Sequence, residues 1–249
     1  MAESALSNVA NEDLAVAPGK RRILLELAIP YGLILLVIWT PRPLQKLLWW
    51  VAAAAIVAIF WLSFDRIEQL GLRTVGLFRA LWVTGAALVI AAVAILTAVL
   101  LHTLRFPPGG ITGFFKTYWA YALWACVQQL LLQGFFLPRC LGLTKTTTSA
   151  ALLAAVLFSL AHLPNPLLTP VTLIWGFAAC LLFVQYRNLY PLAMAHAIVG
   201  IAIAITIPGP VDHNMRVGLG YLAYHHPARP SQPQLVKPSL PQPSPLPQP

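Results

Sequence analysis

Charged residues are scarce in this chain of 249 residues. They make up 9% of the sequence, whereas a soluble domain carries about a quarter, and 59% of the residues are hydrophobic. This number of charges is too small to cover the surface of a soluble domain of this size. Much of the apolar surface must therefore face lipid. The composition therefore excludes a soluble globular protein and predicts an integral membrane protein.

Cysteine is also rare, and its positions show no pairing pattern. Cys126, Cys140 and Cys180 lie in or beside apolar runs without a CxxC spacing, so no disulfide framework is predicted. The basic cluster at residues 20–22 precedes an apolar run, as in a secretory signal, but no small-residue cleavage site follows it. We therefore expect the first apolar run to remain as an uncleaved anchor.

Acidic residues are fewer than basic ones, seven against sixteen, which gives a net charge of +9. The basic residues form no stripe interleaved with exposed aromatics, so nucleic acid is not a predicted partner. They lie instead at the ends of apolar runs, nine on the side of the N-terminus and five on the other side. This bias predicts a multi-pass protein of the cytoplasmic (inner) membrane with its N-terminus inside, and the lipid bilayer as its main partner.

Seven apolar runs are candidates for membrane-spanning helices. A helix needs roughly 20 residues to cross a hydrocarbon core about 30 Å thick. We predict an all-α fold, a polytopic bundle of about seven spans, in which the first and fifth spans have the weakest signals. The expected spans cover residues 23–39, 47–64, 80–101, 114–137, 149–163, 167–186 and 189–207.

Both ends of the chain differ from the transmembrane domain expected over residues 23–207. Residues 1–22 form a polar N-terminal segment, and residues 208–226 are predicted to be an interfacial segment without chemistry of its own. Residues 227–249 contain nine prolines, which predicts an extended, disordered tail. Its PxxP spacings would suit a binding partner, although a plain solvated tail has the same composition.

Polar residues inside the apolar runs concentrate in the fourth, fifth and seventh spans. A polar side chain in hydrocarbon is costly, so it faces the bundle interior and either pairs with another helix or lines a functional cavity. Helical geometry places Cys126, Gln129 and Gln133 on one face. Glu26, near the start of the first span, is expected to reach the interface. The candidate site residues are Gln128, Gln129, Gln133, His162 and His196.

Three motifs at these positions resemble the CPBP family, the type II CAAX prenyl endopeptidases and bacteriocin-processing intramembrane proteases. Residues 128–133 align with the family's EExxxR, residues 158–162 with FxxxH, and residues 196–200 with HxxxN or HxxxD. The resemblance covers roughly residues 115–205. It implies a CAAX prenyl protease-like helical fold and an intramembrane endopeptidase for hydrophobic or prenylated peptides, with Phe158 and Gly200 contacting the substrate.

The chain departs from the family pattern where the family's chemistry is acidic. A glutamine amide has no useful basicity near neutral pH, so the family mechanism cannot apply unchanged. His162 and His196 keep the family residue, but two imidazoles fall short of the three ligands of a catalytic zinc, so no cofactor is assigned. By position, the resemblance places the family's general base at Gln128 and the neighbouring carboxylate at Gln129. It places the family's arginine at Gln133 and its Asn or Asp at Gly200.

Three functional hypotheses follow. In a modified endopeptidase, His162 or His196 acts as the base while Gln128 and Gln129 position water or polarise the scissile carbonyl; a variant uses Cys126 as nucleophile. In a catalytically inactive binder, the cavity holds a lipid, a prenyl chain or a partner's transmembrane segment. A small transporter is disfavoured, because paired broken helices and repeat symmetry are missing from the sequence.

Overall fold

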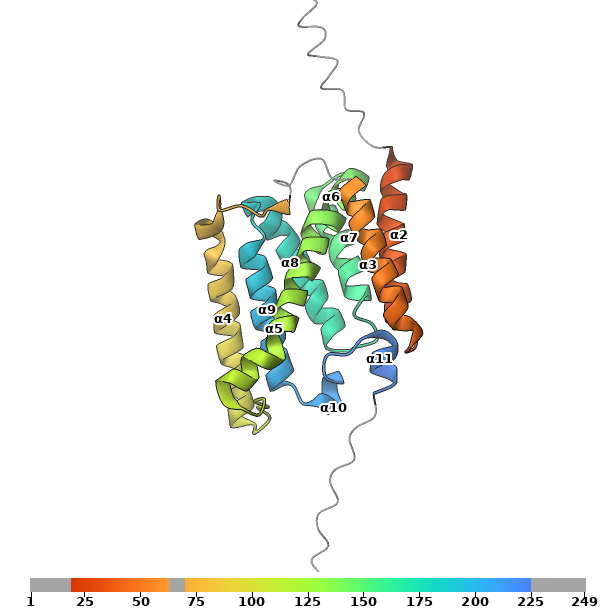
Figure 1. Cartoon of the computed structure of the whole chain (residues 1–249). Helices are drawn as coiled ribbons and strands as arrows, with labels where there is room; N and C mark the ends of the chain where they lie inside the picture. The colour runs from red at the N-terminus through yellow and green to blue at the C-terminus, as the bar shows by residue number, and fades with distance from the viewer. Residues whose placement is uncertain (1–18, 63–69, 225–249) are drawn as a thin grey trace, which may run out of the picture.

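The structure, a computed structural model, describes residues 19–62 and 70–224, and every regular element within these ranges is a helix (Figure 1). The Pro-rich tail and nearly all of the polar N-terminal segment lie outside the described residues. The helices are α2 (Lys20–Ile38), α3 (Leu44–Leu62), α4 (Leu77–Leu100), α5 (Gly110–Gln129), the π-helix η2 (Leu130–Phe136), α6 (Leu137–Leu143), α7 (Thr147–Leu160), α8 (Leu168–Tyr186), α9 (Tyr190–Thr206), α10 (Gly209–Asp212) and α11 (Gly218–Leu222).

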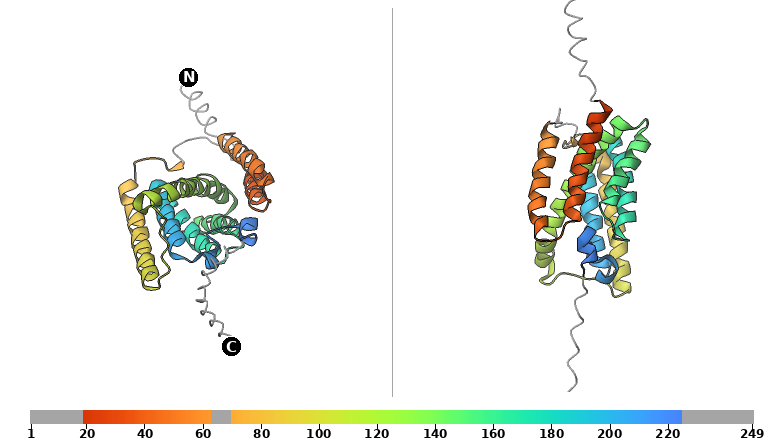
Figure 2. Two further views of the ribbon diagram at one scale, coloured as in Figure 1. Left: turned by 60° about the horizontal axis from the view of Figure 1, so that its bottom comes forward. Right: turned by 90° about the vertical axis from the view of Figure 1, so that its right-hand side faces the viewer.

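The helices confirm the predicted all-α membrane bundle. Each of the seven expected spans corresponds to a helix, and the longer helices run side by side in one general direction (Figure 2). Four stretches of the described chain are long and apolar enough to cross a membrane: Leu44–Leu62, Leu77–Leu100, Gly110–Leu143 and Leu168–Tyr186. Two further apolar helices, α7 and α9, are shorter. The orientation with the N-terminus inside stays a prediction.

The outer faces of the bundle carry large apolar side chains that contact no other part of the described chain closely. Trp61 on α3, Phe78 on α4 and Ile174 on α8 are 80%, 83% and 72% exposed. Such side chains would form unfavourable patches in water, whereas lipid tails solvate them without cost. The exposed surface therefore has the character of a lipid-facing surface.

Small residues let the inner helices approach one another closely. The α7 face toward α8 contains a run of buried alanines, and a Cβ atom added at Gly176 of α8 would lie 3.4 Å from the Cα of Ala155 and 3.2 Å from the Phe158 ring. Close backbone approach through small side chains is the usual basis of helix packing in membranes. Helix α9 packs in the same bundle against α4 and α5, which makes it central.

The fourth predicted span is one continuous helical stretch of 34 residues, in which η2 interrupts the α-helical hydrogen bonding. Pro138, just after η2, has no N–H to donate to the preceding turn, so the regular α-helical pattern cannot run through it. Gly134 in η2 packs tightly, since an added Cβ would lie 2.7 Å from Leu70. π-Helical turns are frequent at functional sites, and this one carries part of the glutamine motif.

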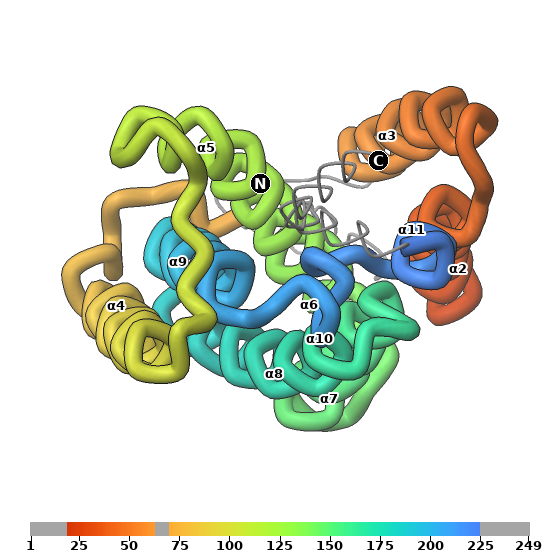
Figure 3. The backbone as a smooth tube through the Cα atoms, turned by 90° about the horizontal axis from the view of Figure 1, so that it is seen from below, coloured from red at the N-terminus to blue at the C-terminus, as the bar shows by residue number. Residues whose placement is uncertain are grey.

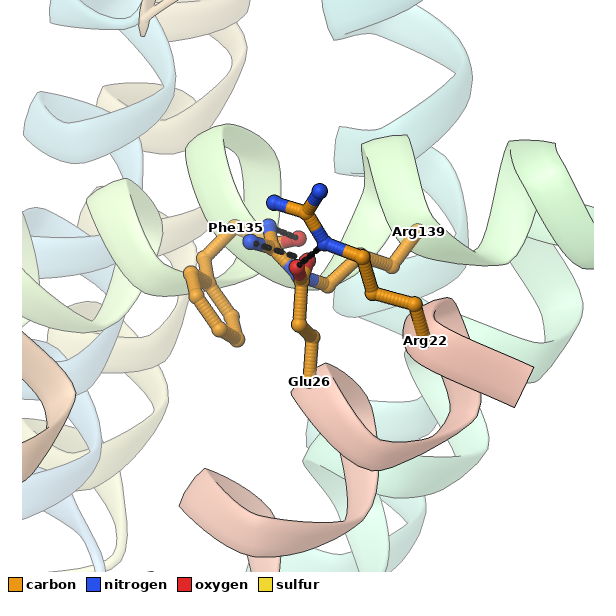
Figure 4. A network of polar contacts seen from close by, with 4 residues as sticks. All are labelled: Arg22, Glu26, Phe135 and Arg139. Atoms are coloured by element: carbon orange, nitrogen blue, oxygen red, sulfur yellow. Dashed lines mark hydrogen bonds and ion pairs between the residues drawn. The ribbon is translucent and has the colours of Figure 1, made fainter. Parts of the chain in front are cut away.

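An ion pair joins the α2–α3 hairpin to the end of this long helix (Figure 4). Glu26 accepts hydrogen bonds from Arg139 at 3.1 Å and from Arg22 at 2.8 Å, and the Glu26 and Arg139 side chains are only 17% and 11% exposed. Arg139 also donates to the carbonyl of Phe135 and stacks on its ring. The expectation that Glu26 reaches the interface stays a prediction, and the structure adds that its carboxylate pairs with Arg22 and Arg139 at one end of the bundle.

Removing one partner of this pair should destabilise the protein, since the other charge would stay nearly buried. We expect Glu26→Leu to lower the unfolding free energy by on the order of 3 kcal/mol. Thermal unfolding in detergent should show the double variant Glu26→Leu/Arg139→Leu to be more stable than Glu26→Leu alone. Arg22→Leu, at a side chain 62% exposed, is the control and should cost less than about 1 kcal/mol. An equal loss in Arg22→Leu and Glu26→Leu would contradict this assignment.

Candidate functional site

Two of the three motif glutamines lie inside the helix packing and connect to His196. Gln129 and Gln133 have no exposed surface, and Gln133 Nε2 donates to Gln129 Oε1 at 3.3 Å. Gln129 Nε2 in turn lies 2.9 Å from Nδ1 of the buried His196 on α9. We call Gln133, Gln129 and His196 the amide network, because two neutral amides and an imidazole are hydrogen-bonded in series. The buried Gln133 Oε1 has no hydrogen-bond partner among the described residues.

The orientation of the two amides favours one tautomer of His196. Because Gln133 donates to the Gln129 carbonyl oxygen, the Gln129 NH₂ group is the part that faces His196. A neutral imidazole nitrogen that receives an N–H must hold a lone pair, so the proton of His196 is on Nε2. The ring therefore offers an N–H donor through its second nitrogen.

His162 has the opposite arrangement. Its Nδ1 lies 2.7 Å from the carbonyl oxygen of Phe158, one helical turn earlier. A carbonyl can only accept, so Nδ1 carries the proton and Nε2 of the neutral ring holds a lone pair. Both imidazoles pack edge-on against the Phe158 ring, with centroid distances of 4.9 Å for His162 and 5.9 Å for His196. One phenyl ring thus adjoins both a donor imidazole and an acceptor imidazole.

These rings open on a cavity of about 1120 Å³ lined by helices α2, α3, α5, η2, α7, α8 and α9. Figure 3 shows these helices arranged around a common centre, with the α2–α3 hairpin on the side away from α4. Most of the lining is apolar, and no charged side chain among the described residues contributes to it. The cavity is larger than the range of about 300 to 1,000 Å³ common for small-molecule sites and suits a long apolar ligand.

Gly200 and Tyr121 fit together at the wall of this cavity. A Cβ atom at Gly200 would overlap the Tyr121 ring, at 1.8 Å from the hydroxyl oxygen and 2.6 Å from Cζ. Gly200 follows His196 by one turn of α9, so Tyr121 occupies the space beside the imidazole. The position where the family motif has Asn or Asp therefore lacks a side chain, and Tyr121 fills its place.

A turn after α9 closes one end of the cavity. Asn214 and Met215 line it, and a side-chain amide of the buried Asn165 donates to the carbonyl of Asp212 at 2.8 Å. Three consecutive non-glycine residues adopt left-handed backbone conformations, which the surrounding hydrogen bonds must hold in place: His213, Asn214 and Met215. The segment predicted to have no chemistry of its own thus forms part of the cavity wall.

Carboxylates are missing from the surroundings of the two histidines. Residues 69–211 contain no Asp or Glu. Of the carboxylates in the described chain, Glu26 is paired with arginines and Asp212 accepts from the N–H of Asn214, and neither lines the cavity. Burial raises the pKa of the Asp212 carboxyl, opposed by that N–H and by the charge of Arg105. Neither group is placed to activate a water beside an imidazole.

The described residues also contain no cluster of three or more His, Cys, Asp or Glu side chains that could hold a metal ion. His162 and His196 would supply two nitrogen ligands, and the nearby side chains are neutral amides and aromatic rings. A catalytic zinc usually has three protein ligands. The donor set is therefore a poor fit for zinc.

The structure divides the predicted site residues into two groups. The first group lines the cavity: Gln128, Phe158, His162, His196 and Gly200. Gln129 and Gln133 lie behind His196 and do not line it. Cys126 is exposed although it lies only about 60° from the buried Gln129 around α5, so this rotation is enough to leave the buried interface. The Cys126 nucleophile variant has no support from this position.

Tyr121 and Trp124 are cavity residues that the sequence reasoning missed. Together with Thr117 and Gln128 they form a stripe on α5, and all four line the cavity. The spacing of four, three and four residues is that of one helical face, so the signal was present in the sequence. It was missed because the reasoning followed polar residues, and a membrane helix has aromatic residues on several faces.

Comparison with known proteins agrees with the motif resemblance. Residues 111–202 match the family described as type II CAAX prenyl endopeptidase Rce1-like. No curated protein and no solved structure matches the chain significantly. The predicted kinship is confirmed over this segment, which contains the glutamine motif, both histidines and Gly200.

The contact between Tyr121 and Gly200 predicts that the effect of a substitution at one position on the unfolding free energy depends strongly on the residue at the other. Gly200→Ala should lower the unfolding free energy by about 1 to 3 kcal/mol, because the methyl group overpacks against the tyrosine. In a Tyr121→Ala background the same substitution should cost nothing further. Gly85→Ala on α4, where an added Cβ meets nothing within 4 Å, is the control and should be neutral or slightly stabilising. Equal effects of the two alanine substitutions in thermal unfolding would contradict the contact.

Proposed function

Since residues 111–202 match the type II CAAX prenyl endopeptidase Rce1-like family, we propose that the chain uses the cavity of this family to bind an apolar chain without cleaving it. The observation that carries the proposal is a cavity of about 1120 Å³ whose polar groups are neutral. The ligand class is a lipid acyl chain or a prenyl chain, alone or attached to a peptide.

The chemistry of the wall supports binding rather than hydrolysis. Hydrolysis of a peptide needs a group that takes a proton from water and a group that stabilises the developing oxyanion. Gln128 lines the cavity where the family motif has its base, and an amide cannot take up that proton. Gln129 is bonded to His196 instead of holding a water. The lost base is therefore not replaced by another carboxylate in the described chain.

The shape and lining of the cavity support a chain-like ligand. Aromatic and aliphatic side chains from α2, α3 and α5 form most of the wall, and each buried CH₂ group of a ligand would contribute roughly 0.8 kcal/mol. Helix α3 packs mainly against α2, so one wall of the cavity is an element with few other attachments. A bilayer lipid or prenyl group would reach such a cavity without leaving an apolar environment.

An endopeptidase remains the second candidate, and one observation favours it. His162 presents a lone pair on Nε2, whereas His196 presents an N–H, so the pair has one proton acceptor and one donor. In a modified mechanism His162 would take the proton of water and His196 would stabilise the oxyanion. This arrangement supports His162 as the base and His196 as the donor in such a mechanism.

Binding without cleavage can be measured on the purified full-length chain in lipid nanodiscs. We expect a photoreactive farnesyl probe and a photoreactive palmitoyl probe to label cavity residues, while mass spectrometry shows a farnesylated peptide to remain intact. Ala53→Trp, which fills the cavity from α3, should reduce labelling about tenfold or more. Ala58→Trp, on an exposed part of the same helix outside the cavity, is the matched control.

Two results would overturn the proposal. Labelling that is equal in the Ala53→Trp and Ala58→Trp variants would mean that the probes bind outside the cavity. Cleavage of the peptide by the unmodified chain, lost in both His162→Ala and His196→Ala, would establish the endopeptidase instead.

A further inference from the structure

Gln129 does not line the cavity, yet its contact with His196 determines which hydrogen-bonding group of that imidazole is available to a ligand. Its amide is oriented by Gln133, which donates to its oxygen, and its NH₂ group donates to Nδ1 of His196. A carboxylate at this position would instead accept a hydrogen bond from Nδ1–H, and Nε2 would then hold the lone pair. The glutamine therefore reverses the hydrogen-bonding character of the imidazole nitrogen that remains for the cavity.

His162 supplies the complementary group, a hydrogen-bond acceptor. Its Nδ1–H donates to the carbonyl of Phe158 within its own helical turn, so the lone pair on Nε2 is the available group. Both rings contact the same Phe158 ring and line the same cavity, which places an N–H donor and a nitrogen acceptor beside one apolar side chain. A ligand group that satisfies both must itself contain an acceptor and a donor close together.

The remaining lining restricts the charge of that group. Among the described residues, neither a lysine or arginine nor an aspartate or glutamate lines the cavity. A carboxylate, phosphate or ammonium headgroup would therefore enter an apolar space without a counter-ion, which is strongly unfavourable. A neutral secondary amide has a carbonyl acceptor and an N–H donor on adjacent atoms, which point in opposite directions in the trans form, and it carries no charge.

We propose that Gln129 is a positioning residue that holds His196 as an N–H donor, and that the cavity thereby selects apolar chains bearing a secondary amide. His196 Nε2–H donates to the amide carbonyl, and His162 Nε2 accepts from the amide N–H. This inference rests on the proposed binding function. The amide could belong to an N-acylated lipid or to a lipidated peptide, and the two sources share this chemistry.

The tautomer of His196 is the direct test of the positioning role. In full-length protein labelled with ¹⁵N-histidine in nanodiscs, the His196 resonances are assigned by their loss in His196→Gln. We expect Nδ1 to be unprotonated and Nε2 protonated in the wild type, and Nδ1 to gain a proton in Gln129→Glu. Gln128→Glu adds the same charge one residue earlier, without a bond to His196, and should leave the His196 tautomer unchanged. A wild-type proton on Nδ1 with a lone pair on Nε2 would overturn the proposal.

Ligand selectivity is the second test and uses probes that share one chain. N-methyl palmitamide has both a donor and an acceptor, methyl palmitate has only the acceptor, and heptadecane has neither. We expect the amide to bind about tenfold more tightly than the ester, since the ester leaves the His162 nitrogen unpaired. His162→Phe should abolish this ratio, whereas Gln129→Glu should weaken amide and ester together relative to the hydrocarbon. A farnesylated cysteine with an N-methyl amide end distinguishes a peptide source from a lipid source.

The outcomes separate the inference from the function on which it rests. Equal affinities for amide, ester and hydrocarbon in the wild type would overturn the selectivity while leaving the apolar binding function standing. Failure of all the probes to bind would remove the binding function itself. An amide preference that persists in His162→Phe would also overturn the assignment, because the acceptor would then lie elsewhere.

Discussion

A polar side chain inside a hydrocarbon layer must find its partner within the protein, and the arrangement around His196 follows from this constraint. Gln133, Gln129 and His196 form a neutral series from η2 to α9, with Gln129 and Gln133 fully buried. A cation in these places would need an acidic counter-charge, and residues 69–211 contain no Asp or Glu to supply one. Every position of the glutamine motif is thus uncharged, in agreement with this constraint.

The same constraint keeps the charged side chains that act in packing away from the cavity. The ion pair of Glu26 with Arg139 lies at one end of the bundle, where it ties α2 to α6, and it does not line the cavity. Asp212 lies in the turn after α9 and accepts from the backbone N–H of Asn214. Both carboxylates of the described chain therefore act in packing. The cavity is left with neutral polar groups, and its chemistry is that of hydrogen bonds rather than of proton transfer to a carboxylate.

The two histidines differ in the partner of Nδ1, and this difference gives them opposite hydrogen-bonding characters. A backbone carbonyl faces His162, and a side-chain amide faces His196. Small changes behind an imidazole can thus alter what a binding site presents, although they add no contact to the ligand.

Composition and apolar periodicity were sufficient to predict membrane residence, the all-α bundle and the positions of seven helices, because hydrophobic runs must match the thickness of a bilayer. The spacing of Gln128, His162 and His196 also indicated a site. Tertiary packing decided the rest: that Gln129 lies behind His196 while its neighbour Gln128 faces the cavity, that Tyr121 fills the space at Gly200, and that Arg139 pairs with Glu26. A sequence specifies faces relative to one helix axis, but the rotation of each helix and its choice of partner depend on side chains from helices far away in the chain.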